Sequence, residues 1–212
     1  MIINNSTLNK HYSPICVYLY DFSVATKDIK DCDYSDIFCK ERKTEIEKTE
    51  SSDEKKRKYF SWKLLQFALS ERGINAKKQN LVCDNNGKWH TDGVCFSISH
   101  TKNVVAVAVS DNEVGIDIEK SDRAISKALF DKIACEAEIK AYPQPTVKDV
   151  LILWTKKEAI FKRNGDKVFI AKEINTLNEN AKTIYSENGD IVISVSSTLP
   201  LNLKLFQINF LP

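Results

Sequence analysis

The sequence predicts a protein of the α+β class, with short strands and long helices in separate stretches of the chain. Short runs rich in β-branched residues are bounded by turn residues, and two longer stretches carry helix start and stop residues. The chain has 212 residues, of which 42% are hydrophobic and 28% are charged. It is therefore long enough to fold as one large globular domain or as two small ones.

Strand patterns, each short and rich in apolar residues, are expected at residues 15–20, 81–83, 94–99, 103–109, 114–119, 183–195 and 201–210. The run 103–109 is apolar on both faces, which predicts a fully buried strand. Turn residues 110–113 follow it, so we expect 103–109 and 114–119 to form an antiparallel hairpin. Asn188-Gly189 predicts a type I′ turn within the stretch 183–195.

Helical patterns are expected at residues 52–72, 124–142 and 147–164. Ser52 is the expected N-cap of the first helix, and Gly73 fits its C-terminal end. Thr146 and Asp149 resemble a capping box at the start of the third helix, and Gly165 ends it.

Residues 28–50 are polar and have no clear period, so no element is assigned to them. The expected boundary is the 110–113 turn, which divides the chain into residues 1–111 and 112–212.

The composition argues against several classes of protein. The net charge is only +2, which does not suit a dedicated nucleic-acid binder. We expect no membrane span and a cytoplasmic location, because the sequence has no apolar run of about 18 residues and no signal-peptide pattern. The six cysteines are scattered, which argues against a structural zinc site or a disulfide framework. Phosphate-binding and nucleophile motifs of the GxGxxG and GxSxG kinds are absent.

The stretch 114–120 reads VGIDIEK, with two carboxylates among apolar residues. On a strand the apolar residues face the core, while Gly115, Asp117 and Glu119 face the other way. The carboxylates then lie roughly 7 Å apart, and Gly115 leaves room for a ligand. Two hard oxygen ligands with space beside them suit Mg²⁺ and a phosphate. The ordinary alternative is an edge strand with a solvated acidic face.

In the helix expected at 147–164, Glu158 lies in the middle of an apolar stripe and Lys162 lies at its edge. A glutamate in such a stripe is costly unless it is paired or binds a metal. Together with Asp117 and Glu119 it would make a three-carboxylate Mg²⁺ site. The alternative is a Glu158–Lys162 ion pair on an exposed helix face.

Three further features are candidate anion contacts, and each is also common on ordinary protein surfaces. His100 follows a predicted strand and could bind phosphate as a charged donor. The turn Asn86-Gly87-Lys88 presents a lysine. The basic run 55–58 could contribute one or two phosphate contacts if it lay near an anion site.

In these residues the sequence resembles the 4′-phosphopantetheinyl transferases, and in particular their larger, monomeric, surfactin-synthetase-activating class. The resemblance spans roughly residues 10–205 and rests on four blocks with a further match at Arg57. The blocks are Asn86-Gly87-Lys88, Ser97 to His100, Gly115 to Lys120, and Trp154 to Lys162. The last two are the most specific, because the family signature reads G-[IV]-D followed by W-x-x-K-E-[AS]-x-x-K.

The resemblance implies two similar α+β halves, a pseudo-dimer with the active site between them. It also implies a Mg²⁺-dependent transfer of the phosphopantetheine arm of coenzyme A to a serine of an apo carrier protein. The second product is adenosine 3′,5′-bisphosphate. The implied partners are an acyl, peptidyl or polyketide carrier protein and coenzyme A, with neither nucleic acid nor membrane.

The resemblance also implies a role for each site residue. The implied metal ligands are Asp117, Glu119 and Glu158. Glu158 is in addition the implied general base, and Lys162 is implied to contact the diphosphate. The implied coenzyme A contacts, besides Lys162, are Arg57, Lys88, Ser99 and His100.

Two positions depart from the family pattern. Trp89 stands where the family often has proline, and Lys167 stands where it often has a glycine after the helix. Two other functions stay open at this point: a non-catalytic module that binds coenzyme A or a carrier protein, and a Mg²⁺-dependent phosphohydrolase. Basic residues expected on the surface could attract an acidic carrier. They are Arg123, Lys127, Lys132, Lys140, and Lys156 or Lys157.

Overall fold

The computed structural model describes residues 13–25 and 34–211, and it confirms the α+β class. The elements in chain order are β1 (Ile15–Asp21), η1 (Phe22–Val24), α1 (Lys40–Lys48), α2 (Ser52–Glu71), η3 (Ala76–Lys78), β2 (Val82–Cys83), β3 (Trp89–His90), β4 (Cys95–Thr101), β5 (Val104–Ser110), β6 (Val114–Lys120), α3 (Ala128–Ile133), α4 (Glu136–Ala141), α5 (Val147–Asn164), η4 (Ala171–Glu173), β7 (Ala181–Tyr185), β8 (Ile191–Ser197) and β9 (Leu203–Ile208).

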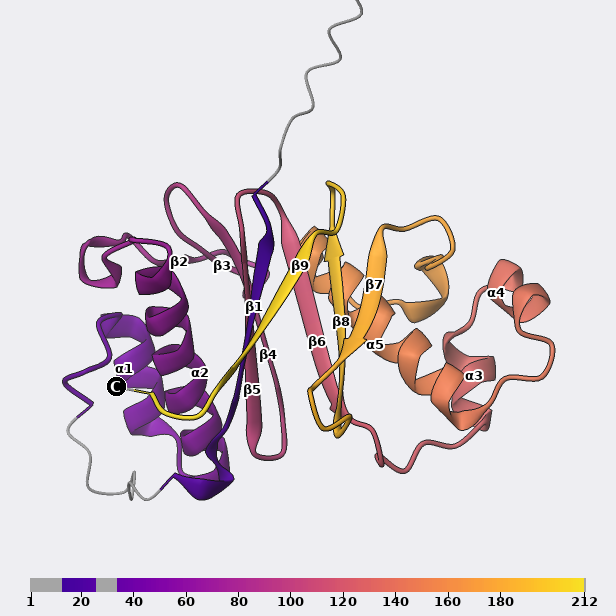
Figure 1. Cartoon of the computed structure of the whole chain (residues 1–212), viewed down its shortest axis with the longest axis horizontal. Coiled ribbons are helices and arrows are strands. Elements are labelled where there is room, and N and C mark those ends of the chain that lie inside the picture. The colour runs from indigo at the N-terminus through magenta and orange to yellow at the C-terminus, as the bar shows by residue number, and fades with distance from the viewer. Residues whose placement is uncertain (1–12, 26–33, 212) are drawn as a thin grey trace, which may run out of the picture.

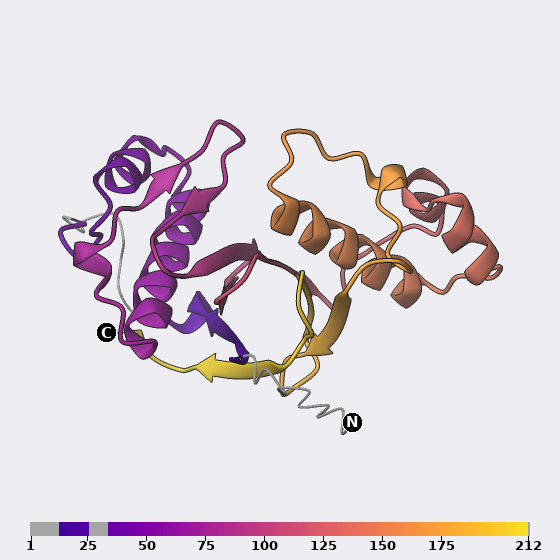
Figure 2. The same cartoon turned by 90° about the horizontal axis from the view of Figure 1, so that it is seen from above.

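Two sheets occupy the middle of the molecule, and helices cover them from either side (Figure 1). The first sheet has the order β4-β5-β1-β9 and packs against α2, while the second has the order β6-β8-β7 and packs against α5. Figure 2 shows the two helices on opposite flanks, with the strands between them. None of the described helices is both long enough and apolar enough to cross a bilayer.

Strand β5 is buried on both faces, as its sequence predicts. Val105, Val107 and Val109 belong to the core under α2. The alternate residues Ala106 and Ala108 belong to a second core between the two sheets, together with the apolar residues of β6 and β8. The side-chain alternation of a strand thus lets β5 take part in both cores.

Helix α5 has the ends that the sequence predicts. The Thr146 side chain accepts a hydrogen bond from the Asp149 amide, and Asp149 completes the capping box. Gly165 ends the helix with a φ of 70°, a conformation that glycine adopts readily. Helix α2 is also confirmed, although its N-cap is Ser51, which accepts from the Glu54 amide, and not Ser52.

The expected hairpin between 103–109 and 114–119 is wrong. β6 pairs with β8 in the second sheet, and the 110–113 turn carries the chain from one sheet to the other. β6 instead lies beside β4. Serine hydroxyls of β4, and not its backbone carbonyls, accept hydrogen bonds from the β6 amides. The hydroxyl of Ser97 accepts from the Ile116 amide at 3.1 Å, and that of Ser99 accepts from the Ile118 amide at 3.2 Å.

Three further expectations need correction. The helix expected at 124–142 is two short helices, α3 and α4, separated by extended backbone at Ala134 and Cys135. The turn at Asn188-Gly189 is not type I′, because only Gly189 has a positive φ and that turn needs two. Helix α1 lies in the stretch 28–50, where its sequence shows no period because it buries a single residue, Ile46.

The last strand returns to the first sheet. β9 pairs with β1 in parallel, with Leu203 opposite Ile15. The sheets do change at the 110–113 turn, but the C-terminal residues complete the sheet of the N-terminal part. The division into residues 1–111 and 112–212 and the internal similarity of the two halves stay predictions.

Candidate active site

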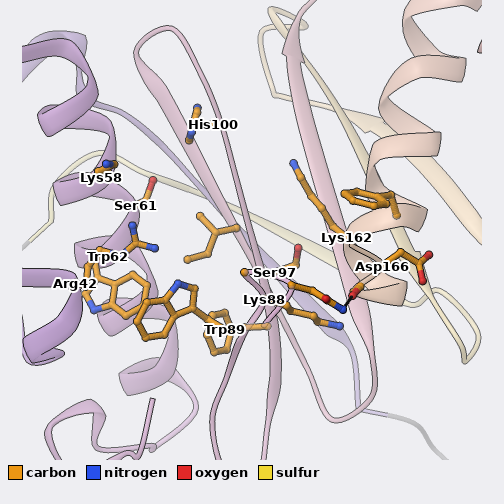
Figure 3. A pocket seen from close by; sticks show the side chains of 16 residues that line it. Arg42, Lys58, Ser61, Trp62, Lys88, Trp89, Ser97, His100, Lys162 and Asp166 are labelled. Carbon is orange, nitrogen blue, oxygen red and sulfur yellow. Dashed lines mark hydrogen bonds between the residues drawn. The ribbon is translucent and has the colours of Figure 1, made fainter. Parts of the chain in front are cut away.

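A pocket of about 360 Å³ lies where the two parts of the chain meet. Its walls come from α1, α2, the β2–β3 turn, β4 and the C-terminal end of α5. Figure 3 shows Arg42, Trp62 and Trp89 gathered on the α2 side, with Lys162 on α5 across the pocket. The pocket is therefore built by elements that are far apart in the sequence.

One end of the pocket is aromatic and cationic. The Trp62 and Trp89 rings meet edge to face, with centroids 4.9 Å apart. The Arg42 guanidinium carbon lies 4.7 Å from the Trp62 ring centroid and 5.3 Å from that of Trp89. The Trp62 ring itself is only 1% exposed, so the groups that can pack against a flat heterocycle here are the Trp89 ring and the Arg42 guanidinium.

Several buried polar atoms around this end have no hydrogen-bond partner among the described residues. They are the Nε atom of Arg42, the Trp62 indole nitrogen and the Ser61 hydroxyl; the Nε atom of Arg57, nearer the start of α2, is unpartnered as well. Arg42, Ser61 and Trp62 line the pocket. A buried polar group without a partner costs about 1–3 kcal/mol.

The basic groups predicted from the sequence come together at the pocket. Lys88, His100 and Lys162 all line it, and Lys58 of the basic run 55–58 lines it too. Burial of the imidazole against the pocket wall removes part of its hydration, and this lowers the pKa of His100. The positive charges of Arg57 and Lys162 lower the same pKa further. The imidazole is nevertheless exposed on its open side, so an anion bound there would favour its protonated form.

Lys88 reaches across the pocket and joins the two parts of the chain. Its ammonium lies 2.6 Å from a Glu113 carboxylate oxygen and donates to the Arg163 carbonyl at the end of α5 at 2.7 Å. Asn86 donates to the Gly165 carbonyl at 2.8 Å. The turn that carries Lys88 thus caps the C-terminal end of α5, where a cation is favourable.

The carboxylates predicted from the sequence lie beside the pocket. Asp117 is buried, and one of its oxygens accepts from Ser99 at 2.9 Å and from Lys162 at 2.7 Å. Burial raises the pKa of Glu158, and the nearby charge of Asp117 raises it further, while Lys162 and Arg123 oppose these effects. The charges of Asp117 and Lys162 thus both act on Glu158 where α5 packs on β6.

Glu119 and Ser99 are placed differently from these residues. Glu119 forms an ion pair with Arg123 and accepts weakly from the Thr101 hydroxyl at 3.4 Å. Ser99 is buried beneath the pocket, where it orients Asp117 and the β6 backbone. Any effect of Ser99 on a bound nucleotide would act through these partners.

Gly115 serves a purpose other than the one expected from the sequence. We expected it to leave room for a ligand, but α5 fills that space. A Cβ atom at this position would overlap the Ala159 carbonyl oxygen and would lie 2.5 Å from the Arg163 amide nitrogen. Glycine is needed here because the helix backbone packs directly on β6. This close approach is what brings Lys162 of α5 within 2.7 Å of Asp117.

The two lysines that precede Glu158 have opposite surroundings. Lys156 is partly exposed, whereas Lys157, a candidate for the basic surface, has a fully buried side chain. The expectation of an exposed Lys157 is therefore wrong, because its ammonium is paired with Glu138 inside the protein. The other predicted surface residues are exposed, namely Arg123, Lys127, Lys132 and Lys140.

The carboxylates do not form a ready-made metal cage. Among the residues that the structure describes, no group of three or more His, Cys, Asp and Glu side chains is arranged to hold a metal ion. Lys162 and Arg123 occupy oxygens of Asp117 and Glu119 instead. The donor set still suits Mg²⁺ in its chemistry, because it offers carboxylate oxygens.

Sequence reasoning missed the aromatic end of the pocket. Arg42 belongs to the helix that was not predicted, and Trp62 looks like an ordinary core residue of α2. Trp89 stands out in the sequence only as a departure from the family pattern, which often has proline there. No periodic signal links the three, since their contacts are set by the tertiary fold.

The comparison with family models supports the resemblance for part of the chain. Residues 113–201 match the model described as the 4′-phosphopantetheinyl transferase superfamily. That stretch contains Asp117, Glu119, Glu158 and Lys162, while Lys88 and His100 lie outside it. Among curated proteins, none matches the chain. The match supports a phosphopantetheinyl-transfer function in general terms.

Proposed function

We propose that this protein transfers the 4′-phosphopantetheine arm of coenzyme A to a serine of an apo carrier protein, with adenosine 3′,5′-bisphosphate as the second product. We further propose that it belongs to the larger, monomeric, surfactin-synthetase-activating class. One observation carries the proposal: a pocket with an aromatic end and basic walls is lined by Lys162, which binds the buried carboxylate of Asp117 and lies one helical turn after Glu158.

The pocket suits the nucleotide part of coenzyme A. At its aromatic end, the Trp89 ring and the Arg42 guanidinium can pack against the base. Lys88, His100 and Lys162 supply positive charge along the same pocket for phosphates. In this proposal Arg57 acts beside His100, whose pKa it affects.

The reaction needs a base for the serine hydroxyl. The serine oxygen forms a bond to the phosphorus that carries the pantetheine arm, and the bond from that phosphorus to the bridging oxygen breaks. In our proposal Glu158 takes the serine proton, since its raised pKa makes it a better proton acceptor than an ordinary glutamate. Lys162 stabilises the developing negative charge on the diphosphate.

We propose that Asp117, Glu119 and Glu158 hold Mg²⁺, for which Lys162 and Arg123 would have to leave their present carboxylate partners. The ion, when bound, supplies positive charge that neutralises the diphosphate. Asp117 is kept in place by Ser99, whose hydroxyl donates to it at 2.9 Å.

The decisive experiment is intact-mass analysis of a panel of apo carriers after incubation with the protein, coenzyme A and Mg²⁺. One phosphopantetheine arm should be added to a serine, and chelation of the metal with EDTA should stop the addition. A Glu158→Gln variant, which keeps the shape but cannot accept a proton, is the matched control. If no carrier gains mass where a known transferase modifies it, the proposal fails. Binding of coenzyme A without transfer would favour the non-catalytic alternative.

A further inference from the structure

The ion pair between Lys157 and Glu138 is fully buried: both side chains have 0% exposure, and the charged atoms lie 2.7 Å apart. Lys157 comes from α5, immediately before Glu158, and Glu138 comes from α4. A buried pair of charges is seldom the most stable choice, since two apolar side chains of similar volume often stabilise a protein as well. The Lys157–Glu138 pair is therefore better explained by a role in fixing the local geometry than by added stability.

Every hydrogen-bonding position of the pair is occupied. The ammonium of Lys157 donates to Glu138 and to the carbonyl oxygens of Ala171 and Ile174. One oxygen of Glu138 accepts from the amide and the hydroxyl of Thr176, at 2.9 and 2.7 Å. Its other oxygen accepts from the Cys135 amide at 2.9 Å. The three ammonium protons are all used, as the geometry of lysine permits.

These contacts converge on one segment, residues 165–176, which follows α5. Lys157 binds its backbone at two carbonyls, and Glu138 binds it at Thr176. The Phe169 ring in this segment packs edge to face on Trp154 and Phe161, at centroid distances of 5.6 and 5.2 Å. Trp154 and Phe161 lie on the same face of α5 as Glu158, one turn before it and one turn after it.

The same segment also presents apolar side chains to the solvent, over a hollow that Ile160 and Asn164 line on the other side of α5. Val168 is 66% exposed and Ile170 is 48% exposed. Asp166, at the start of the segment, lines the pocket. The segment therefore begins at the pocket rim and covers the Trp154–Phe161 side of α5 through Phe169, and its backbone is held by the buried pair.

We infer that Lys157 and Glu138 are positioning residues that fix segment 165–176 as the wall against which the acceptor protein places its serine next to Glu158. This inference rests on the proposed function. Lys157 and Glu138 do not line the pocket proposed for coenzyme A, so their role differs from that of the pocket residues. Loss of the pair should weaken the use of the carrier and leave coenzyme A binding unchanged.

The test uses the double variant Lys157→Met and Glu138→Leu, which removes both charges and keeps apolar volume. We expect it to fold, with hydrogen exchange raised in residues 165–176 and coenzyme A binding within about twofold of wild type. The KM for the carrier should rise about tenfold, because the serine is no longer well placed. Arg72→Met is the matched control, since it removes an ion pair to Asp111 in the other part of the chain.

The outcomes separate this inference from the proposed function. Raised exchange confined to residues 165–176, with only the carrier KM affected, supports the inference. Unchanged exchange in the double variant, an unchanged carrier KM, or an equal loss in Arg72→Met overturns it. If the wild-type protein modifies no carrier, the proposed reaction fails, while the exchange data still decide whether the pair fixes the segment.

Discussion

The contact between Gly115 and α5 gives the sharpest prediction about how the site is built. In Gly115→Ala the added methyl would lie 2.5 Å from the Arg163 nitrogen, whereas ordinary contacts begin near 3.4 Å. Helix α5 would have to move by more than about 1 Å, because the Ala159 carbonyl oxygen lies closer still and both contacts are with backbone atoms, which have no rotamer to adjust. That shift would carry Glu158 and Lys162 away from Asp117.

Two magnitudes follow from this shift. Overpacking of a well-packed contact should lower the free energy of unfolding by about 1–3 kcal/mol. Misplacement of a reacting group by about 1 Å can cost about 10²-fold in rate, so kcat for transfer should fall by about that factor. Urea unfolding followed by tryptophan fluorescence measures the first, and single-turnover transfer to a carrier measures the second.

Gly189→Ala separates lost stability from lost geometry. Gly189 has a φ of 77° and nothing within 4 Å of the added methyl, so alanine there costs about 1–2 kcal/mol through backbone strain alone. It should be destabilised without a matching loss of turnover. The prediction fails if Gly115→Ala has the same free energy of unfolding and the same kcat as the wild type. It also fails if Gly189→Ala loses as much kcat as Gly115→Ala, because the close approach of α5 to β6 would then not determine the geometry of the site.

Other predictions concern the chemistry and the partners. Asp117→Ala should lower kcat by about 10²-fold or more, and wild-type turnover in that variant would remove Asp117 from the site. Turnover should rise with pH through the raised pKa of Glu158 and then level off, because the carboxylate is the form that accepts a proton; Glu158→Asp with an unshifted profile would contradict this. Trp89→Ala should raise the Kd for coenzyme A by about tenfold, measured by calorimetry, through loss of base stacking. Added salt should raise the carrier KM more than the coenzyme A KM, and charge reversal at Lys127 and Lys132 should have the same effect; a carrier KM that is flat across a salt series would refute steering by charge.

Local signals predicted the parts of the fold that depend on neighbouring residues. The capping box at Thr146 and the glycine at 165 define α5 because their hydrogen bonds lie within a few residues of each other. The alternation of 114–120 placed Asp117 on the face that meets α5, since side-chain direction in a strand depends only on position.

Long-range contacts decided what the sequence could not predict. Lys156 and Lys157 are adjacent and chemically identical, yet only the second meets Glu138, which lies on another helix. The pairing of β6 with β8 depends on hydrogen bonds to a strand more than 70 residues later, and the 110–113 turn does not encode it. The glycine in GIDIEK marks a close approach, but its neighbour could be a ligand or a helix until the fold is known.

The return of β9 to the first sheet has a consequence for how the molecule is made. β1 and β9 lie side by side in parallel, although nearly the whole described chain separates them. On the ribosome, β1 emerges long before its partner, so its edge must wait unpaired while β4, β5 and the second sheet are synthesised. Closing a loop of this length also opposes early pairing, which makes the parallel contact a late event in folding. A nascent chain halted just before Leu203 would therefore hold the residues of the pocket on a sheet that is still open at one edge.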